Sequence, residues 1–174
     1  EQEWASVQRA LRRIAQAHIR NVRLLLVDAR IALERLFTPQ TVQRMYALFP
    51  CPWPKERHVK HRLFAQTFLT LLNNRLVPEG TVQMVTDHES YLHWVLAQVS
   101  DTGFVARWTT IAPRFSTKYE RKWRETGQQE FYDLRLRKTT HVARPLIEDA
   151  PLQTHRIEHF DPVNFQPGTR HGAI

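Results

Sequence analysis

Residues 64–87 read FAQTFLTLLNNRLVPEGTVQMVTD, and this stretch decides the class of fold. Its first part is amphipathic, because apolar residues recur at the spacing of one helix face: Phe68, Leu69, Leu72 and Leu76. The turn residues Pro78-Glu79-Gly80 are expected to end that helix. The apolar run over residues 81–86 then predicts a buried strand that stops before Asp87. A helix followed directly by a strand is the repeating unit of an α/β protein.

The same alternation continues in both directions along the chain. We predict helices over residues 6–18, 29–37 and 89–99, and strands over residues 22–27, 45–49 and 131–137. Alternating helices and strands favour an α/β fold with a mostly parallel sheet and helices on both faces. Residues 139–174 are rich in proline and show no helical period, so we predict an extended tail after a domain of residues 1–138.

The composition is that of a basic globular protein. The chain has 174 residues, of which 42% are hydrophobic, enough for one domain with a core. Lys and Arg outnumber Asp and Glu by 25 to 17, so the formal charge of +8 favours a polyanionic partner such as nucleic acid. The single cysteine, Cys51, excludes a disulfide framework. The sequence shows neither a membrane span nor a secretory signal, and we expect a cytoplasmic monomer or homodimer.

Three polar features directly follow predicted strands. Asp28 follows residues 22–27, a proline-rich loop begins at Pro50, and Asp87 follows residues 81–86. Ligands of parallel sheets bind beyond the carboxyl ends of the strands, so these features are expected to share one functional rim. Asp28 and Asp87 can also serve only as caps of the helices that follow them.

The densest functional signal is FPCPWPK at residues 49–55, followed by RHVKHR at residues 57–62. Three prolines restrict the backbone and hold Trp53 and Lys55 in fixed directions. The basic segment can contact successive phosphates, and Trp53 can either stack on an unpaired base or pack in the core. A charge run by itself is more often a solvated face, but its place after a buried strand favours function.

This segment resembles the FPDPWPKxRHxKRR signature of the bacterial tRNA (guanine-N7)-methyltransferases. The resemblance continues in TDHESY at residues 86–91, which is similar to that family's TDWExY, and in TKYERK at residues 117–122, which is similar to its TxFExK. It covers about residues 1–138. It implies a Rossmann-like class I methyltransferase fold whose first strand and glycine-rich loop are missing from this chain. It also implies methyl transfer from S-adenosylmethionine to guanine N7 in the variable loop of tRNA.

The resemblance implies roles for individual residues. Cofactor contacts fall to Glu1, Asp28 and Cys51, and Cys51 stands where the family has a catalytic Asp. Substrate contacts fall to Lys55, Asp87, Thr117, Lys118, Tyr119 and Glu120, and the RNA-facing segment consists of Arg57, His58, Lys60, His61 and Arg62. The carboxylates of Asp87 and Glu120 can accept hydrogen bonds from the N1–H and amino group of guanine, a pattern that adenine does not offer.

Other interpretations of the same residues stay open. Thr117 and Glu120 have the spacing of a capping box, which needs no substrate. Cys51 in place of an acid removes a negative charge from the site, so a noncatalytic RNA-binding homologue is the alternative to the enzyme. His155 and His159 have metal-like spacing but no cysteine partner, and no metal site is predicted.

Overall fold

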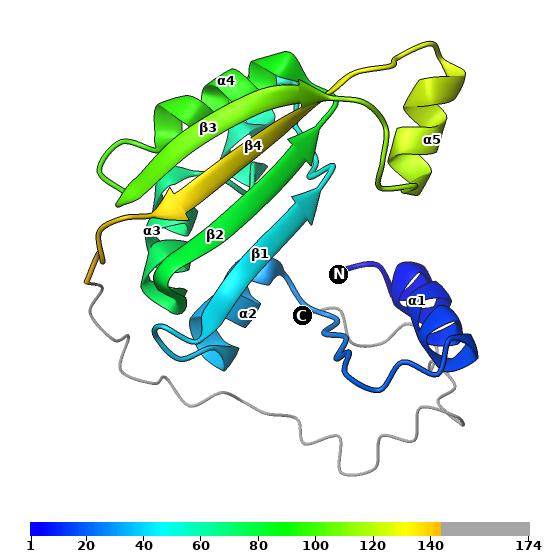
Figure 1. Cartoon of the computed structure of the whole chain (residues 1–174), viewed down its shortest axis with the longest axis horizontal. Helices are drawn as coiled ribbons and strands as arrows, with labels where there is room; N and C mark the ends of the chain where they lie inside the picture. The colour runs from blue at the N-terminus through cyan, green and yellow to red at the C-terminus, as the bar shows by residue number, and fades with distance from the viewer. Residues whose placement is uncertain (144–174) are drawn as a thin grey trace. The chain divides into compact units, whose positions relative to one another are not determined.

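The structure, a computed structural model, describes residues 1–143 (Figure 1). Its helices are α1 (Trp4–Gln16), α2 (Ala29–Leu36), the short 3-10 helix η1 (Glu56–His61), α3 (Gln66–Arg75), α4 (Glu89–Gln98) and α5 (Lys118–Glu125). Its strands are β1 (Val42–Leu48), β2 (Leu76–Thr86), β3 (Phe104–Ile111) and β4 (Phe131–Lys138), which form a sheet in the order β1-β2-β4-β3.

The predicted α/β class is confirmed, but the sheet is mixed rather than mostly parallel. β1 and β2 pair in parallel, whereas β4 runs antiparallel to both β2 and β3. The connection over residues 112–130 begins and ends at the same edge of the sheet. β4 therefore enters between β2 and β3 and runs in the opposite direction to both. The sequence analysis missed β3, and this strand completes the antiparallel half of the sheet.

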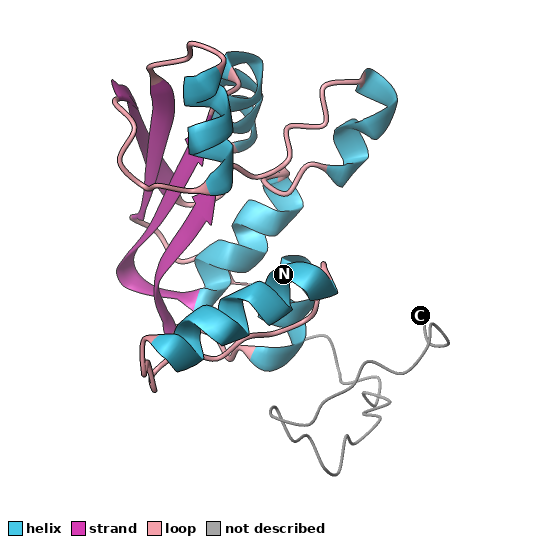
Figure 2. Cartoon of the chain, turned by 90° about the vertical axis from the view of Figure 1, so that its right-hand side faces the viewer, coloured by secondary structure: helices cyan, strands magenta, loops and turns pink. Residues whose placement is uncertain are grey.

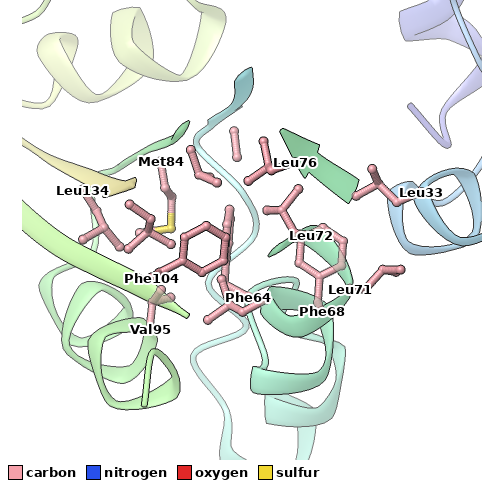
Figure 3. Packing of buried hydrophobic residues seen from close by; sticks show 14 of the residues in the cluster. Leu33, Phe64, Phe68, Leu71, Leu72, Leu76, Met84, Val95, Phe104 and Leu134 are labelled. Carbon is pink, nitrogen blue, oxygen red and sulfur yellow. The ribbon is translucent and has the colours of Figure 1, made fainter. Parts of the chain in front are cut away.

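One face of the sheet packs on α3 and α4 and forms the main core (Figure 3). Leu69 and Leu72 of the predicted helix face lie on α3 in this core and are completely buried. Leu76 is equally buried, but the prediction of a helix ended by residues 78–80 is wrong, because α3 ends at Arg75 and β2 already begins at Leu76 and includes these three residues. Alternate residues of the strands meet these helices, since strand side chains point to opposite faces in turn. Those strand residues are apolar: Met45, Ala47, Val82, Met84, Phe104, Ala106, Leu134 and Leu136.

The expectation of helices on both faces is only partly met. A second, smaller cluster on the opposite face joins Phe49, Val85 and Phe131 to Ile111 at the end of β3, to Phe115 and to Trp123 of α5. This cluster lies toward the carboxyl ends of β1 and β2. Over the rest of that face, Figures 1 and 2 show no helix among the described residues.

The predicted strand over residues 22–27 is wrong for this structure. The segment is extended, but within residues 1–143 its strand-like contacts are limited to those of Val27 and Leu25 with the backbone of Glu1. Its apolar side chains remain exposed, with Leu26 at 52%. β1 pairs only with β2 among the described strands, so a crevice of about 410 Å³ separates its free edge from this segment. Among the described residues the apolar run therefore pairs with Glu1 but with no strand of the sheet.

The first residues of the predicted tail dock on the domain. Asn73 of α3 donates a hydrogen bond to the Thr140 carbonyl at 2.9 Å and accepts one from the Val142 amide at 2.9 Å. Lys138 is buried, and its ammonium donates to the Asn73 and Leu76 carbonyls at 2.8 and 2.7 Å. Residues 144–174, with His155 and His159, lie outside the described part, so the proposed boundary at residue 138 stays a prediction.

We predict that two Leu→Ala substitutions lower the free energy of unfolding by very different amounts. Leu72→Ala should lower the free energy of unfolding by about 2–5 kcal/mol, because it leaves a cavity in the core. Leu26→Ala should change it by less than about 0.5 kcal/mol, since that side chain is half exposed. Denaturant unfolding of both variants measures the difference. Similar losses in the two variants would mean that residues 22–27 are buried after all.

Candidate functional site

The proline loop leaves the carboxyl end of β1 in a direction set by its backbone. The Phe49 amide donates a hydrogen bond to the Val85 carbonyl at 2.7 Å, which ties the loop to the end of β2. Phe49 and Trp53 both have positive φ, at 55° and 44°, a conformation uncommon for residues other than glycine. The Phe49 ring packs edge-on against Phe131, with centroids 5.3 Å apart. Strand pairing and aromatic packing therefore fix where the loop begins.

Arg62 holds the far side of this loop. Its Nε donates to the Pro52 carbonyl at 2.8 Å and its Nη2 to the Trp53 carbonyl at 3.3 Å. Its guanidinium lies 4.8 Å from the Trp94 ring centroid, a cation–π contact with α4. The side chain is only 9% exposed. Arg62 was predicted to face RNA with its neighbours, but in this structure it is engaged inside the protein.

Tyr91 completes the environment of Arg62. The guanidinium carbon lies 5.7 Å from its ring centroid, and burial raises the pKa of Tyr91 to about 12. The phenol therefore stays neutral beside the arginine, and the charge of Arg62 is met by carbonyl dipoles and aromatic faces. The sequence offered no signal that separates this arginine from Arg57, because both stand in one basic run.

The remaining residues of the basic segment are accessible. Lys55, Arg57, Lys60 and His61 are exposed, and His58 is half-buried. The His58 and His61 rings lie 5.6 and 5.2 Å from the Trp53 ring, centroid to centroid. Trp53 therefore belongs to a small aromatic cluster beside exposed cations rather than to the main core.

A pocket of about 530 Å³ opens between the proline loop and residues 27–30. It brings together three residues predicted as cofactor contacts from distant parts of the chain: Glu1, Asp28 and Cys51. Trp53 and His61 also line it. Cys51 is exposed, so a thiol stands at this pocket where the methyltransferase family that the proline loop resembles has a carboxylate.

Asp28 caps α2, as its position after an extended segment allows. Its Oδ1 accepts from the Arg30 amide at 2.8 Å, and its Oδ2 lies 2.6 Å from an Arg30 guanidinium nitrogen. Gln2 donates to the same Oδ2 at 3.0 Å. The hydrogen bond from the Arg30 side chain holds the pKa of Asp28 below its usual value. The carboxylate is thus ionised and faces the pocket from a fixed position.

Glu1 reaches the same pocket through backbone pairing. Its amino group donates to the Leu25 carbonyl at 3.2 Å, and its carbonyl accepts from the Val27 amide at 3.0 Å. Its Oε1 accepts from the amides of Gln2 and Glu3, each at 2.9 Å. The carboxylates of Glu1 and Asp28 can accept hydrogen bonds from hydroxyl or amino groups of a nucleoside, so the pocket fits the adenosine half of a nucleotide-like cofactor.

Asp87 differs from Asp28 because it caps no helix. His88 takes the N-cap position of α4, and the Asp87 backbone carbonyl accepts from Gln128 Nε2 at 3.1 Å. Its carboxylate has no hydrogen-bond or ion-pair partner within residues 1–143. Of the predicted substrate contacts, it is the acidic group with unused acceptor capacity.

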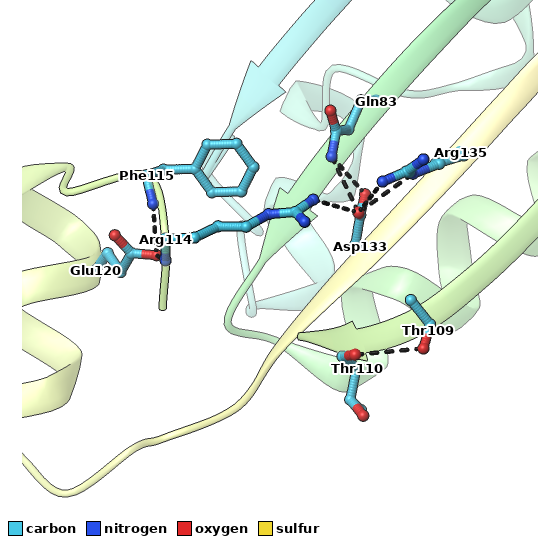
Figure 4. Close-up of polar contacts among 8 residues, drawn as sticks. All are labelled: Gln83, Thr109, Thr110, Arg114, Phe115, Glu120, Asp133 and Arg135. Carbon is cyan, nitrogen blue, oxygen red and sulfur yellow. Dashed lines mark hydrogen bonds and ion pairs between the residues drawn. The ribbon is translucent and has the colours of Figure 1, made fainter. Parts of the chain in front are cut away.

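Thr117 and Glu120 form the cap that their spacing predicts. The Thr117 hydroxyl accepts from the Glu120 amide at 3.1 Å at the start of α5. The Glu120 carboxylate accepts from the amides of Arg114 at 2.6 Å and Phe115 at 3.1 Å (Figure 4). It also accepts from the Ser116 amide. Glu120 is 2% exposed. It therefore organises the loop before α5, and contact with guanine would require that loop to open.

The other residues of this motif point outward. Tyr119 is 45% exposed and stacks at 6.3 Å on the Phe49 ring at the start of the proline loop. The Lys118 ammonium lies 5.0 Å from the Tyr119 ring centroid. The structure thus places residues 117–120 beside the carboxyl end of β1. Within residues 1–143 no group of side chains could hold a metal ion, and no helix is long and apolar enough to cross a membrane.

Comparison with known proteins gives consistent matches. A protein family described as "Putative methyltransferase" matches residues 1–133. The chain is 39% identical over 142 residues to a tRNA (guanine-N(7)-)-methyltransferase of Chlorobium phaeobacteroides, a match that covers 82% of this chain and 70% of that protein. It is 31% identical over 159 residues to the protein of that name from Thermotoga maritima, a match that covers 87% of this chain and 50% of the relative.

A solved structure shows the same fold. The precorrin-6y C5,15-methyltransferase of Geobacter metallireducens superposes with a TM-score of 0.54 at 16% identity, over 79% of this chain and 65% of that one. At this identity the likeness concerns the fold alone.

The chain spans between half and about 70% of the length of the two sequence relatives named above.

We predict that Arg62→Lys destabilises the protein, whereas Arg57→Lys does not. Lysine keeps the charge at position 62 but loses the planar fork that reaches two carbonyls and stacks on Trp94. The free energy of unfolding should fall by about 1–3 kcal/mol and Trp fluorescence should change. Equal stability of the two variants would contradict the anchoring role of Arg62.

We predict a pH-dependent contribution from Asp28. A carboxylate with a folded-state pKa below the unfolded value, about 3.9, stabilises the protein above that pH, and this stabilisation is lost as the pH falls through the folded-state pKa. Wild type should therefore be more stable than Asp28→Asn at neutral pH, and the difference should shrink in acid. Urea unfolding across the acid range measures it, with Arg30→Gln as the control that removes the cause. A constant difference would refute the assignment.

Proposed function

We propose, because this chain belongs to the tRNA (guanine-N(7)-)-methyltransferase family, that it carries a large part of a site for methyl transfer from S-adenosylmethionine to N7 of a guanine in tRNA. The observation that carries the proposal is one pocket lined by Glu1, Asp28 and Cys51 beside the proline loop. These residues come from three separate segments: backbone hydrogen bonds join Glu1 to Leu25 and Val27, just before Asp28, and the proline loop carries Cys51 beyond the carboxyl end of β1.

The adenosine half of the cofactor is proposed to bind between Glu1 and Asp28. Both carboxylates face the pocket, and their oxygens accept hydrogen bonds from hydroxyl and amino groups. When bound, S-adenosylmethionine supplies an electrophilic methyl group on a sulfonium. The methyl carbon forms a bond to N7 while its bond to sulfur breaks, and the electron pair of that bond stays on sulfur.

The guanine is proposed to bind against Asp87, close to the proline loop. The Asp87 carboxylate is the unpaired acceptor that suits the N1–H and amino group of guanine. N7 is unprotonated, so the reaction needs no residue to remove a proton. What the chain contributes is orientation, and the rigid loop held by Arg62 places Trp53 and Lys55 around the base.

The basic segment is proposed to contact the tRNA backbone near the reacting base. Lys55, Arg57 and Lys60 are exposed cations next to the Trp53 aromatic cluster. Cations that meet phosphates and an aromatic group that stacks on a base are the usual components of an RNA-binding surface.

The test is a methyl-transfer assay on unmodified tRNA with the full-length protein that contains this chain. We expect N7-methylguanosine in the digested product. Asp87→Asn should lower kcat/KM by about 10- to 100-fold, because an amide presents a donor to the guanine amino group. Asp101→Asn, in an exposed turn, is the matched control and should leave it unchanged. A full-length protein that binds tRNA but forms no N7-methylguanosine would establish the noncatalytic homologue instead.

Cys51→Asp tests the electrostatics of the same site. An aspartate there adds a negative charge next to a sulfonium and a base that becomes cationic, so kcat should rise by about 10²-fold. Cys51→Ser, which adds no charge, should stay within a few-fold of wild type. A loss of activity in Cys51→Asp would show that this position does not face the reacting groups.

A further inference from the structure

The sheet face opposite α3 and α4 carries two rows of side chains that cross all four strands. Strand register aligns Arg44, Thr81, Arg137 and Val105 in one row, and Tyr46, Gln83, Arg135 and Arg107 in the next. Together these residues line a hollow of about 630 Å³. We call this surface the basic sheet face.

The composition of the basic sheet face differs from that of the face that helices cover. The covered face presents apolar side chains from the same four strands, whereas these two rows hold four arginines, Tyr46, Gln83 and Thr81, with Val105 as their one aliphatic residue. A sheet face built to pack against a helix is apolar, so this one suits a charged and hydrated partner. The apolar cluster under α5 lies at the other end of the same face.

The charge of this face is only partly neutralised. Arg137 pairs with Glu79. Arg135 and Arg114 share the buried carboxylate of Asp133, at 3.2 and 3.0 Å (Figure 4). Gln83 donates to the same carboxylate at 2.9 Å. Arg44 and Arg107 form no ion pair within residues 1–143. Five arginines thus surround two carboxylates, and the surface keeps a net positive charge.

The two unpaired arginines lie at opposite edges of the sheet. Arg44 is on β1 and Arg107 is on β3, with two strands between them. Neighbouring strands lie about 4.8 Å apart, so the pair spans roughly 14 Å. Tyr46, 59% exposed, lies one row from Arg44 on the same strand. Cations at this spread with an exposed aromatic ring match the chemistry of a sugar-phosphate backbone.

We propose that the basic sheet face binds the phosphate backbone of the tRNA substrate, at a distance from the proline loop. The inference rests on the proposed function, because it assumes the same RNA, and it adds a second contact region. A tRNA that contacts both the proline loop and the basic sheet face would be held in one orientation, because phosphate contacts fix the position of a nucleic acid on a protein without reading its sequence.

The experiment measures tRNA binding by the full-length protein across a salt series. The double variant Arg44→Glu/Arg107→Glu changes the two unpaired cations and leaves the Asp133 network intact. We expect at least about a 10-fold weaker Kd, and a slope of log K against log salt that is shallower by about 2. The control Arg12→Glu/Arg13→Glu makes the same charge change on exposed residues of α1 and should have a much smaller effect.

The outcomes separate this inference from the proposed function. Suppose that wild type makes N7-methylguanosine and that the double variant binds tRNA within two-fold of wild type. This result overturns tRNA binding by the basic sheet face and leaves the proposed enzyme activity standing. If the double variant binds tRNA as wild type does but has a different molecular mass in solution, the basic sheet face is an interface between two copies of the protein. That outcome also overturns the inference. If the glutamate variant fails to fold, Arg44→Gln/Arg107→Gln removes the charges without repulsion and must still weaken binding and reduce the slope.

Discussion

The parallel pairing of β1 with β2 is the constraint on which the site depends. Because both strands run in the same direction, their carboxyl ends lie at one edge, and the loops that follow them meet there. The Phe49 amide bound to the Val85 carbonyl closes this pairing and sets the start of the proline loop. Arg62 then fixes the other side of the loop against α4. An antiparallel arrangement would send the proline loop and Asp87 to opposite ends of the sheet.

Elements with a long apolar periodicity, such as α3 and β2, could be predicted from the sequence, whereas β3 and α5 could not, although Phe104 and Ala106 of β3 lie in the core. α3 and β2 bury the residues whose periodicity predicted them, such as Leu72 and Val82. α5 is almost entirely polar, and Glu120 is its one buried residue, so it gave no such signal. Residues 22–27 show the reverse error, because an apolar run predicts a strand only if a neighbouring strand is there to pair with it.

The sequence predicted which residues lie near one another better than it predicted their contacts. Spacing after strands and resemblance to a family predicted Glu1, Asp28 and Cys51, which the structure gathers in one pocket. The engagement of Arg62 and Glu120 inside the protein could not be predicted, since each depends on backbone groups that only the folded chain brings near. The Asp87 carboxylate has no hydrogen-bond partner within residues 1–143, so Asp87 is the strongest candidate for substrate recognition.

The proposed function requires that the cofactor bind at the rim formed by residues 27–30 and the proline loop. Amide hydrogen exchange of the full-length protein, measured with and without S-adenosylhomocysteine, tests it most directly. We expect slower exchange in peptides that cover residues 22–30 and in those that cover residues 49–55, with little change in β3. Bound ligand without protection of either segment, or with protection confined to other parts of the chain, would contradict this account.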